Sequence, residues 1–501
     1  MTFNRLKIAL LAVGAISVTA CETDLTDINT NPNSPTTAPA TTLFTNATVT
    51  TMGRFNGSFQ TLSMTSLFAH HVAQVQYVEE DRGRIRPETI DALFLGVYTS
   101  ELEDYEKVVA LGTAANSPNT VGPARVMQSW VFQNITDLWG DIPFTEALKG
   151  DIGGPMKPAY DPQEDIYDSL LVRLTEAGAT MNPASTDAGL GSADPIYGGD
   201  VAQWRKFANV LRARMAMRMQ KVDQAKASAE LTAAFAAPGG LFTSNADNAV
   251  LAWPGDGIFN NPWANNFSGR DDHRMAKTLI DTLLAFNDPR LPIYAQPTQA
   301  NPLVYAGLPN GMDNTTVPPF FNTTSRPGAI FYPGATTYGT FGTSAGNAYP
   351  SNILTYAELC FIQAEAAERS IGGLAPGAAA GFYNAGVTAS IEQWGGSPAA
   401  ATTYLGQAGV TYVGGAAGLQ QIHLQKWIAL FTQGSEAWSN WRRTGHPSTI
   451  VAGPSAYPEG IPLARRLPYP GSEQSVNAEA LAAAIARQGA DTYATRMWWD
   501  Q

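Results

Sequence analysis

Apolar residues recur at helical spacing along much of this chain, and this pattern is the strongest constraint on its fold. The clearest example is a run of five apolar side chains separated by steps of four, three, four and four: Trp204, Ala208, Leu211, Met215 and Met219. These steps place all five on one face of a helix, while Arg205, Arg212 and Arg218 take other faces. The pattern predicts an amphipathic helix and a mainly α protein.

Other regions predict helices of the same kind. Residues 356–370 follow Thr355, a candidate N-cap, and end before Gly372 and Gly373, while residues 422–431 show similar spacing. Two N-terminal series also have helical intervals: Phe55, Phe59, Leu62, Leu67 and Val72, then Ile90, Leu93, Val97, Leu102 and Tyr105. Helix pairs of this sort stack as tetratricopeptide-like hairpins, although no clean repeat of about 34 residues is visible. We therefore expect helical hairpins with degenerate repeats.

Two segments interrupt the helical pattern. Residues 253–274 and 301–352 are rich in Gly, Pro, Asn and Thr with isolated aromatic residues, which is typical of long ordered loops or short irregular strands. Long loops often carry function, and the alternative is that these merely wrap the helical core.

The N-terminus has the composition of an export signal. Arg5 and Lys7 precede the apolar residues 8–18, a stretch shorter than the roughly 20 residues that span a bilayer. Small residues then precede Cys21, as in bacterial lipoproteins; the alternative is a plain secretory peptide followed by an incidental cysteine. We expect a lipoprotein signal peptide over residues 1–20, a flexible polar tether over 21–40, and a single body over 41–501.

Composition narrows the possible partners. If Cys21 is lipidated, Cys360 has no intramolecular partner, so no disulfide is expected. The net charge of −12 disfavours nucleic acid. No later stretch approaches 18 unbroken apolar residues, so the body is expected to be soluble and held at the membrane by its lipid.

Several short motifs then resemble those of one family. DINTNPN at residues 27–33, DLWGDIPF at 137–144, DPRL at 288–291 and the helix at 356–366 occur in the order expected. The last third adds QKWIAL at 425–430, GSEAW at 434–438, RRTGHP at 442–447, RRLPYP at 465–470 and WWD at 498–500. Together they resemble the SusD/RagB family of nutrient-binding outer-membrane lipoproteins over nearly the whole chain.

The resemblance implies a function as well as a fold. It implies a mostly helical SusD-like body that captures nutrients at the cell surface and is no enzyme. It also implies a partner, a SusC-like TonB-dependent β-barrel transporter that the protein covers like a hinged lid. The ligand stays open between oligosaccharide and peptide, with oligosaccharide first by family habit. Glu22 and Asp24 partly resemble the acid-rich signal that sends such lipoproteins to the outer face of the outer membrane.

The residues within these motifs indicate structural roles. Trp427 and Trp438 lie eleven positions apart, so one helix or two abutting helices can point both into the core. Arg442 and Arg443 suit a helix C-terminus near an acid such as Glu436. In the closing motif, Arg466 is expected to pair with Glu473.

An enzyme is the sharpest rival interpretation. GTSAG at residues 342–346 matches the nucleophile-elbow pattern around Ser344, which would make the protein a secreted hydrolase. An elbow needs a buried strand before the serine and a helix after it, whereas turn-forming residues and Pro350 flank this one. His423 and His446 lie in segments that look structural. We therefore expect no catalytic residue.

Metal chemistry has little support. No histidine pair has metal-binding helical spacing, and His70 and His71 are expected to form a surface pair on a helix. Asp271 and Asp272 beside Asn265 and Asn266 could bind Ca²⁺ through oxygens, but no twelve-residue loop with alternating acids is present. No cofactor is predicted, and calcium stays possible without support.

A binder of sugars or peptides needs flat aromatic faces and fixed polar groups on accessible loops. Three loop segments offer them, and the ligand-binding candidates are Tyr77, Trp263, Asn265, Asn266, Phe267, Arg270, Tyr338 and Phe341. Tyr77 ends a predicted helix before a charged loop. For each candidate, burial against the helical body is the alternative.

Overall fold

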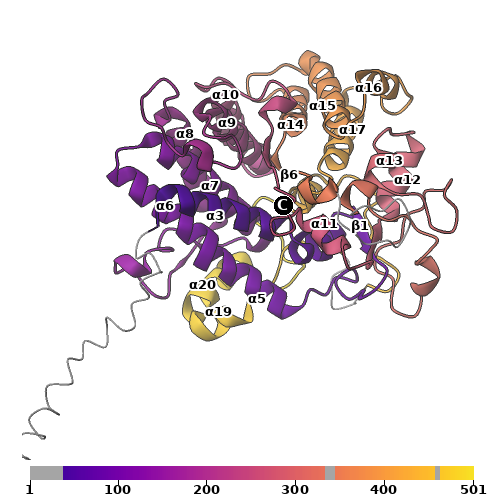
Figure 1. The fold of residues 1–501 in the computed structure, drawn as a ribbon, viewed down its shortest axis with the longest axis horizontal. Helices are drawn as coiled ribbons and strands as arrows, with labels where there is room; N and C mark the ends of the chain where they lie inside the picture. The colour runs from indigo at the N-terminus through magenta and orange to yellow at the C-terminus, as the bar shows by residue number, and fades with distance from the viewer. Residues whose placement is uncertain (1–37, 333–344, 457–462) are drawn as a thin grey trace, which may run out of the picture. The chain divides into compact units, whose positions relative to one another are not determined.

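The computed structural model describes residues 38–332, 345–456 and 463–501, and it is predominantly helical (Figure 1). The mainly α prediction is confirmed. Cys21, Tyr338, Phe341 and Ser344 lie outside the described residues. Among the residues described, no helix combines the length and apolar character needed to cross a membrane.

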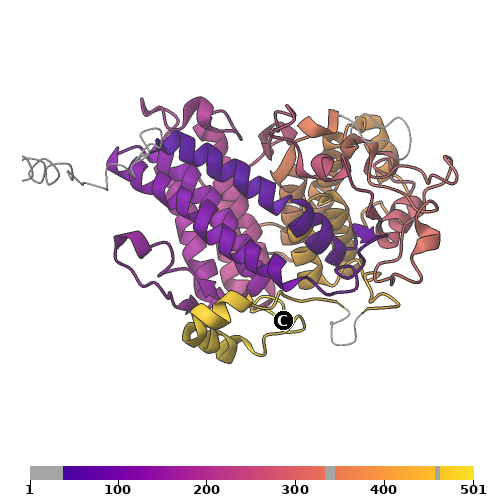
Figure 2. The same ribbon diagram turned by 60° about the horizontal axis from the view of Figure 1, so that its bottom comes forward.

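The N-terminal half is a series of helices packed against their neighbours in sequence. Each of the pairs α6–α7, α7–α8, α8–α9 and α9–α10 is in contact, and α3 packs against α6. Figures 1 and 2 both show these helices side by side. Their bounds are α3 Ala40–Phe55, α5 Pro87–Gly96, α6 Glu103–Ala114, α7 Pro118–Trp139, α8 Gln163–Thr180, α9 Val201–Arg218 and α10 Gln224–Phe235. The prediction of helical hairpins is confirmed here.

A second helical group follows in the last third of the chain. Helix α14 packs against α15, α17 and α9, so it joins the two groups, and α18 packs against α17 and α7. The bounds are α14 Tyr356–Glu368, α15 Ala379–Gln393, α16 Pro398–Leu405, α17 Gly415–Ala429, α18 Gly434–Thr444, α19 Gly471–Val476 and α20 Ala478–Gln488. Thr355 caps α14 by accepting from the backbone N–H of Glu358, as predicted.

Short strands tie distant segments together in three antiparallel pairs. Strand β1 (Val72–Gln74) pairs with β5 (His273–Met275), β2 (Ile142–Pro143) with β3 (Tyr160–Asp161), and β4 (Ala249–Leu251) with β6 (Ser351–Leu354). The first pair connects the N-terminal helices to the loop-rich middle of the chain.

The middle of the chain is irregular, as predicted, with short helical pieces. Residues 253–274 contain α11 (Pro262–Phe267) as well as β5, and α12 (Lys277–Ala285) and α13 (Leu291–Tyr294) follow. The remaining short elements are α4 Ser66–Phe68, the π-helices η1 Ser58–Thr65 and η2 Val97–Leu102, and the 3₁₀ turns η3 Gly150–Ile152, η4 Gly191–Ala193, η5 Met219–Lys221, η6 Asn245–Asp247, η7 Pro318–Phe320, η8 Ala329–Phe331, η9 Ala345–Ala348 and η10 Pro376–Ala378.

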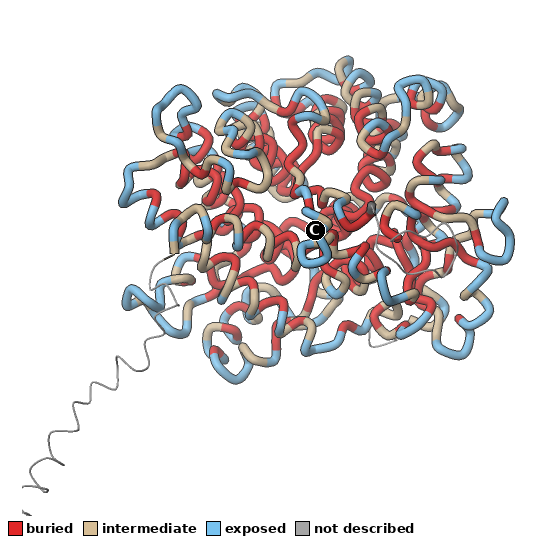
Figure 3. The backbone as a smooth tube through the Cα atoms, viewed as in Figure 1, coloured by how far each residue is buried: buried red, intermediate tan, exposed pale blue. Residues whose placement is uncertain are grey.

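Buried residues run through the centre of both helical groups (Figure 3). Trp427 on α17 and Trp438 on α18 are fully buried, which confirms their predicted core role. Their indole N–H groups donate to the backbone carbonyls of Ala69 (2.8 Å) and Ala464 (3.0 Å). Each ring therefore packs and also satisfies a buried carbonyl.

The helix at residues 204–219 is confirmed as α9, but its polar face, which carries Arg212 and Arg218, is not exposed to solvent. Arg214 and Arg218 are each about 2% exposed at the side chain, and Arg212 is also buried. These arginines can be buried because other helices supply acids that pair with them. Arg214 pairs with Glu358 at 2.6 Å, and Arg218 pairs with Glu436. Periodicity predicts a polar face, and here that face is a buried ionic one.

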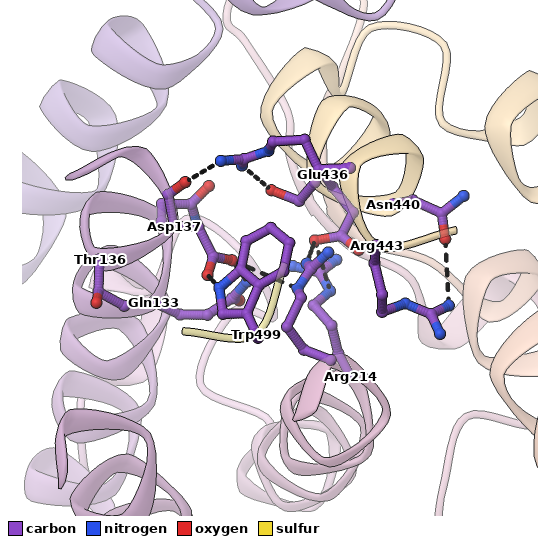
Figure 4. Close-up of polar contacts among 12 residues, drawn as sticks. Gln133, Thr136, Asp137, Arg214, Glu436, Asn440, Arg443 and Trp499 are labelled. Atoms are coloured by element: carbon purple, nitrogen blue, oxygen red, sulfur yellow. Dashed lines mark hydrogen bonds and ion pairs between the residues drawn. The ribbon is translucent and has the colours of Figure 1, made fainter. Parts of the chain in front are cut away.

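These charges belong to a larger cluster, the buried ion network, part of which Figure 4 shows. It comprises Asp137, Arg214, Arg218, Glu358, Glu365, Lys426, Glu436 and Arg443, all buried. Asp137 accepts from the Tyr167 hydroxyl at 2.6 Å and from the Trp499 indole at 2.8 Å. Because the charges and most of their hydrogen-bonding atoms are paired, the network locks α7, α9, α14, α17 and α18 together.

Two predicted ion pairs are wrong. Arg443 makes a bidentate pair with Glu365 of α14, at 2.6 and 2.7 Å, and not with Glu436. Arg466 pairs with Asp491 at 2.6 Å, while Glu473 accepts from the Tyr160 hydroxyl.

His70 and His71, predicted as a surface pair on a helix, are buried. The helix ends at Phe68 and the chain enters β1, which places His71 Nε2 3.0 Å from the Trp427 carbonyl. Burial lowers the pKa of His71 to about 3 and that of His70 to about 4, so both are neutral at pH 7.

Candidate ligand-binding surface

An exposed tyrosine and an arginine meet where the loop after β1 approaches the segment after α11. Tyr77 adopts a left-handed backbone conformation (φ 55°) that few non-glycine residues take, and its side chain is 63% exposed. The guanidinium of Arg270 lies 5.3 Å from the centre of its ring. This cation–π contact holds the ring in place while it stays open to solvent.

A second pair of the same kind joins Phe59 on η1, which packs against α11, to Arg86, the residue before α5. Phe59 is 53% exposed, and the Arg86 guanidinium lies 5.4 Å from its ring centre. Arg86 is positioned in turn by Glu80 at 2.7 Å. We call Phe59, Tyr77, Arg86 and Arg270 the aromatic surface.

The loop that carries Tyr77 is anchored by Asp81. Gln74 and Asp81 exchange hydrogen bonds at 3.2 Å, each backbone N–H donating to the other's side chain. Asn310 donates to Asp81 at 2.7 Å and the Gly311 N–H at 3.2 Å. Burial raises the pKa of Asp81 to about 7, against these donors, which favour the ionised form. Asp81 therefore fixes the conformation of the loop, and Tyr77 lies at the edge of that loop.

The structure separates the predicted ligand residues into two groups. Tyr77, Asn265 and Arg270 are exposed and Asn266 is half-buried. Trp263 and Phe267 are core side chains: Trp263 contacts Phe331 and Phe431, with ring centres 5.0 and 5.5 Å apart, and Phe267 stacks on Tyr332 at 4.7 Å. Their rings support the loop from beneath and do not face its outer surface.

Sequence reasoning missed two exposed aromatic residues near these loops. Phe59 was expected on a buried helical face, but η1 turns it outward. Phe259 is 49% exposed in a turn where the neighbouring amides of Ile258 and Phe259 bond to Asp256 at 2.8 Å. The signal for Phe259 was present, because the adjacent Gly255 and Gly257 cannot cover an aromatic ring locally.

The acids proposed for calcium have protein partners. Asp271 pairs with Arg274 at 2.9 Å and with Arg326, and Asp272 pairs with Arg270. Within residues 38–332, 345–456 and 463–501, no group of three or more His, Cys, Asp or Glu side chains is placed to hold a metal ion.

The surroundings of Ser344 are described only on its C-terminal side. Residues after it form the 3₁₀ turn η9 and then reach Pro350, whereas a nucleophile elbow continues into an α-helix. His423 and His446 stack with ring centres 5.9 Å apart.

A cavity of about 870 Å³ opens between α12, α17 and residues 446–454. Asn310 and His70 are among its lining residues, so the Asp81 anchor lies beside it. Among the residues that the structure describes, no predicted ligand residue lines this cavity.

Comparisons with known proteins agree on the architecture. A family model described as "SusD-like_2: Starch-binding associating with outer membrane" matches residues 32–470. No curated protein matches the sequence of this chain.

Solved structures match over almost the whole chain. A chitin-binding protein is 27% identical with a TM-score of 0.78, covering 92% of this chain and 100% of its own. A SusD homologue from Bacteroides uniformis (24% identical) and a chitin-binding SusD homologue from Flavobacterium johnsoniae (23%) each have a TM-score of 0.78 and cover 92% of this chain and 98% of theirs. At such identities the last two show the fold alone.

Proposed function

This chain belongs to the SusD-like family, whose members associate with the outer membrane, and from that premise we propose that it captures oligosaccharides at the cell surface for uptake. The observation that carries the proposal is the aromatic surface, where two exposed rings are each held by a guanidinium. Sugar rings bury their apolar faces on such rings and bond to polar groups around them. The similarity to a chitin-binding protein at 27% identity supports a glycan over a peptide.

The proposal also covers how the protein is attached to the membrane and where its ligand goes. Cys21 carries the lipid, residues 21–40 form the tether, and the body delivers its ligand to a SusC-like TonB-dependent transporter. The protein binds its ligand and does not transform it.

Replacing Tyr77 with alanine tests the binding role. The ring is exposed, so its loss removes ligand contact without opening the core, and truncating an aromatic anchor costs about 2 kcal/mol or more of binding energy. We expect affinity for the best oligosaccharide in a glycan screen to fall roughly thirtyfold, measured by calorimetric titration.

Ile152→Ala is the matched control, because Ile152 is 76% exposed on the separate turn η3. It is expected to bind like the wild type. Saturation by peptides alone, or an unchanged affinity for Tyr77→Ala, would contradict the proposal.

Replacing Cys21 with serine tests the anchor and the partner. Without the thiol no acyl chain is attached, so the protein is expected to move from the membrane fraction to the soluble fraction. The wild type, extracted gently from membranes, is expected to bring a β-barrel transporter with it. Recovery of the wild type without a β-barrel protein would contradict the proposed transporter partner. Retention of Cys21→Ser in the membrane fraction would contradict the proposed lipid anchor.

A further inference from the structure

The 870 Å³ cavity has two helical walls that face the same space. Helix α12 contributes Thr278, Thr282 and Ala285, and α17 contributes Ala417, Gln421 and Leu424. In each helix these positions are separated by steps of four and three, so each set lies on one face. The volume is within the range of about 300–1,000 Å³ that is usual for small-molecule sites.

The lining carries no uncompensated charge at neutral pH. Lys277 pairs with Asp281 at 2.5 Å, four residues along the same helix. Burial lowers the pKa of His70 to about 4 and also lowers that of His446, so both imidazoles are neutral. An ionic ligand would find no free counter-charge here, and the lining suits a neutral one.

The apolar part of the lining is aliphatic more than aromatic. Val413 and Val451 are 67% and 60% exposed, and Phe286 is a half-buried ring. Neutral hydrogen-bonding groups lie among them, including the exposed side chains of Gln420 and Thr449. Gln421 bonds to the carbonyls of Gly409 (3.0 Å) and Thr411 (2.9 Å) and thereby fixes the loop that carries Val413.

We propose that this cavity is a second ligand site, distinct from the aromatic surface, and that it binds an uncharged N-acetylated oligosaccharide. Glucose and N-acetylglucosamine have the same pyranose ring face, so only the acetamido group can distinguish them in this cavity, where Phe286 provides an aromatic ring. An acetamido group offers a single methyl and an amide, which match isolated aliphatic side chains beside neutral amides and hydroxyls. The inference rests on the proposed capture of oligosaccharides and names the sugar class.

One hydrogen bond connects the lining of the cavity to the loop of Tyr77. Asn310 lines the cavity and donates to Asp81, which anchors the loop of Tyr77.

Calorimetric titration of the whole protein with tri-N-acetylchitotriose and with maltotriose tests the inference. Ala417→Phe puts a ring into the cavity from an exposed helical position, while Ala416→Phe puts the same ring on the adjacent position, which does not line the cavity. We expect Ala417→Phe to weaken tri-N-acetylchitotriose binding at least tenfold and to leave maltotriose binding unchanged. Ala416→Phe is expected to match the wild type with both sugars.

The possible failures are distinguishable. If the wild type binds tri-N-acetylchitotriose and Ala417→Phe binds it equally well, the cavity assignment is wrong and the proposed function stands. If Ala417→Phe weakens both sugars equally, the N-acetyl preference is wrong. If the wild type binds neither these sugars nor any other oligosaccharide, the proposed function fails together with this inference.

Discussion

Replacing Glu436 with glutamine is expected to lower the free energy of unfolding by about 3–5 kcal/mol, because it removes one partner of a buried ionic group. Glu436 is 7% exposed at its side chain and pairs with Arg218, while Lys426 lies 3.6 Å and Arg214 3.8 Å away. Glutamine preserves the volume, so the loss reports charge and not a cavity. The midpoint of urea unfolding measures it.

The effect is expected to depend on pH in a defined direction. Burial alone would raise the pKa of Glu436, but Arg218, Arg214 and Lys426 outweigh it and hold the pKa below the ordinary 4.5. A depressed pKa stabilises the folded state above about pH 4.5, and this stabilisation is lost as the pH falls through the folded-state pKa. The wild type should therefore lose its advantage over Glu436→Gln on acidification below pH 4.5.

Asp281→Asn is the matched control, since Asp281 also pairs with a cation but is 53% exposed. Exposed pairs contribute at most about 1 kcal/mol. Equal losses for the two variants would mean that burial does not set the strength of the network.

Replacing Trp263 with alanine is expected to destabilise the protein by about 3–5 kcal/mol, the usual cost of removing a buried tryptophan. The ring is about 2% exposed and lies among Phe267, Phe331 and Phe431. Urea unfolding at constant pH measures the change. This result would identify Trp263 as support for the loops that carry the aromatic surface.

Phe259→Ala provides the comparison within the same segment, because Phe259 is 49% exposed. Its unfolding midpoint is expected to stay near that of the wild type. If Trp263→Ala instead keeps wild-type stability and loses oligosaccharide binding, Trp263 is a ligand contact, as its sequence context predicted.

Local patterns predicted the helices well, because helical spacing is a property of neighbouring residues. The N-cap at Thr355 and the burial of Trp427 and Trp438 follow from such short-range signals. The burial of the α9 arginines was not predicted, because their partners are distant in the sequence. The acid that pairs with Arg214 lies 144 residues away and the one that pairs with Arg218 lies 218 residues away, which no local window includes.

The candidate site was predictable only in part. Tyr77 could be found because a charged loop follows it, and the structure leaves its ring exposed. Trp263 and Phe267 lie in a Gly- and Asn-rich stretch that also predicted exposure, but Phe331 and Tyr332 from a distant turn cover them. The cavity between α12 and α17 was not predictable, since a space between helices has no signature in either helix alone.

The hydrogen bond between Asp137 and Trp499 has a consequence for how the protein is made. These residues are 362 positions apart, and Asp137 lies on a helix that is synthesised early. Until residue 499 has followed, this buried carboxylate lacks its indole donor, and the other charges that surround it also come from later helices. Synthesis runs from the N-terminus to the C-terminus, so the N-terminal helices can form first but can complete their packing only after nearly the whole body has been made.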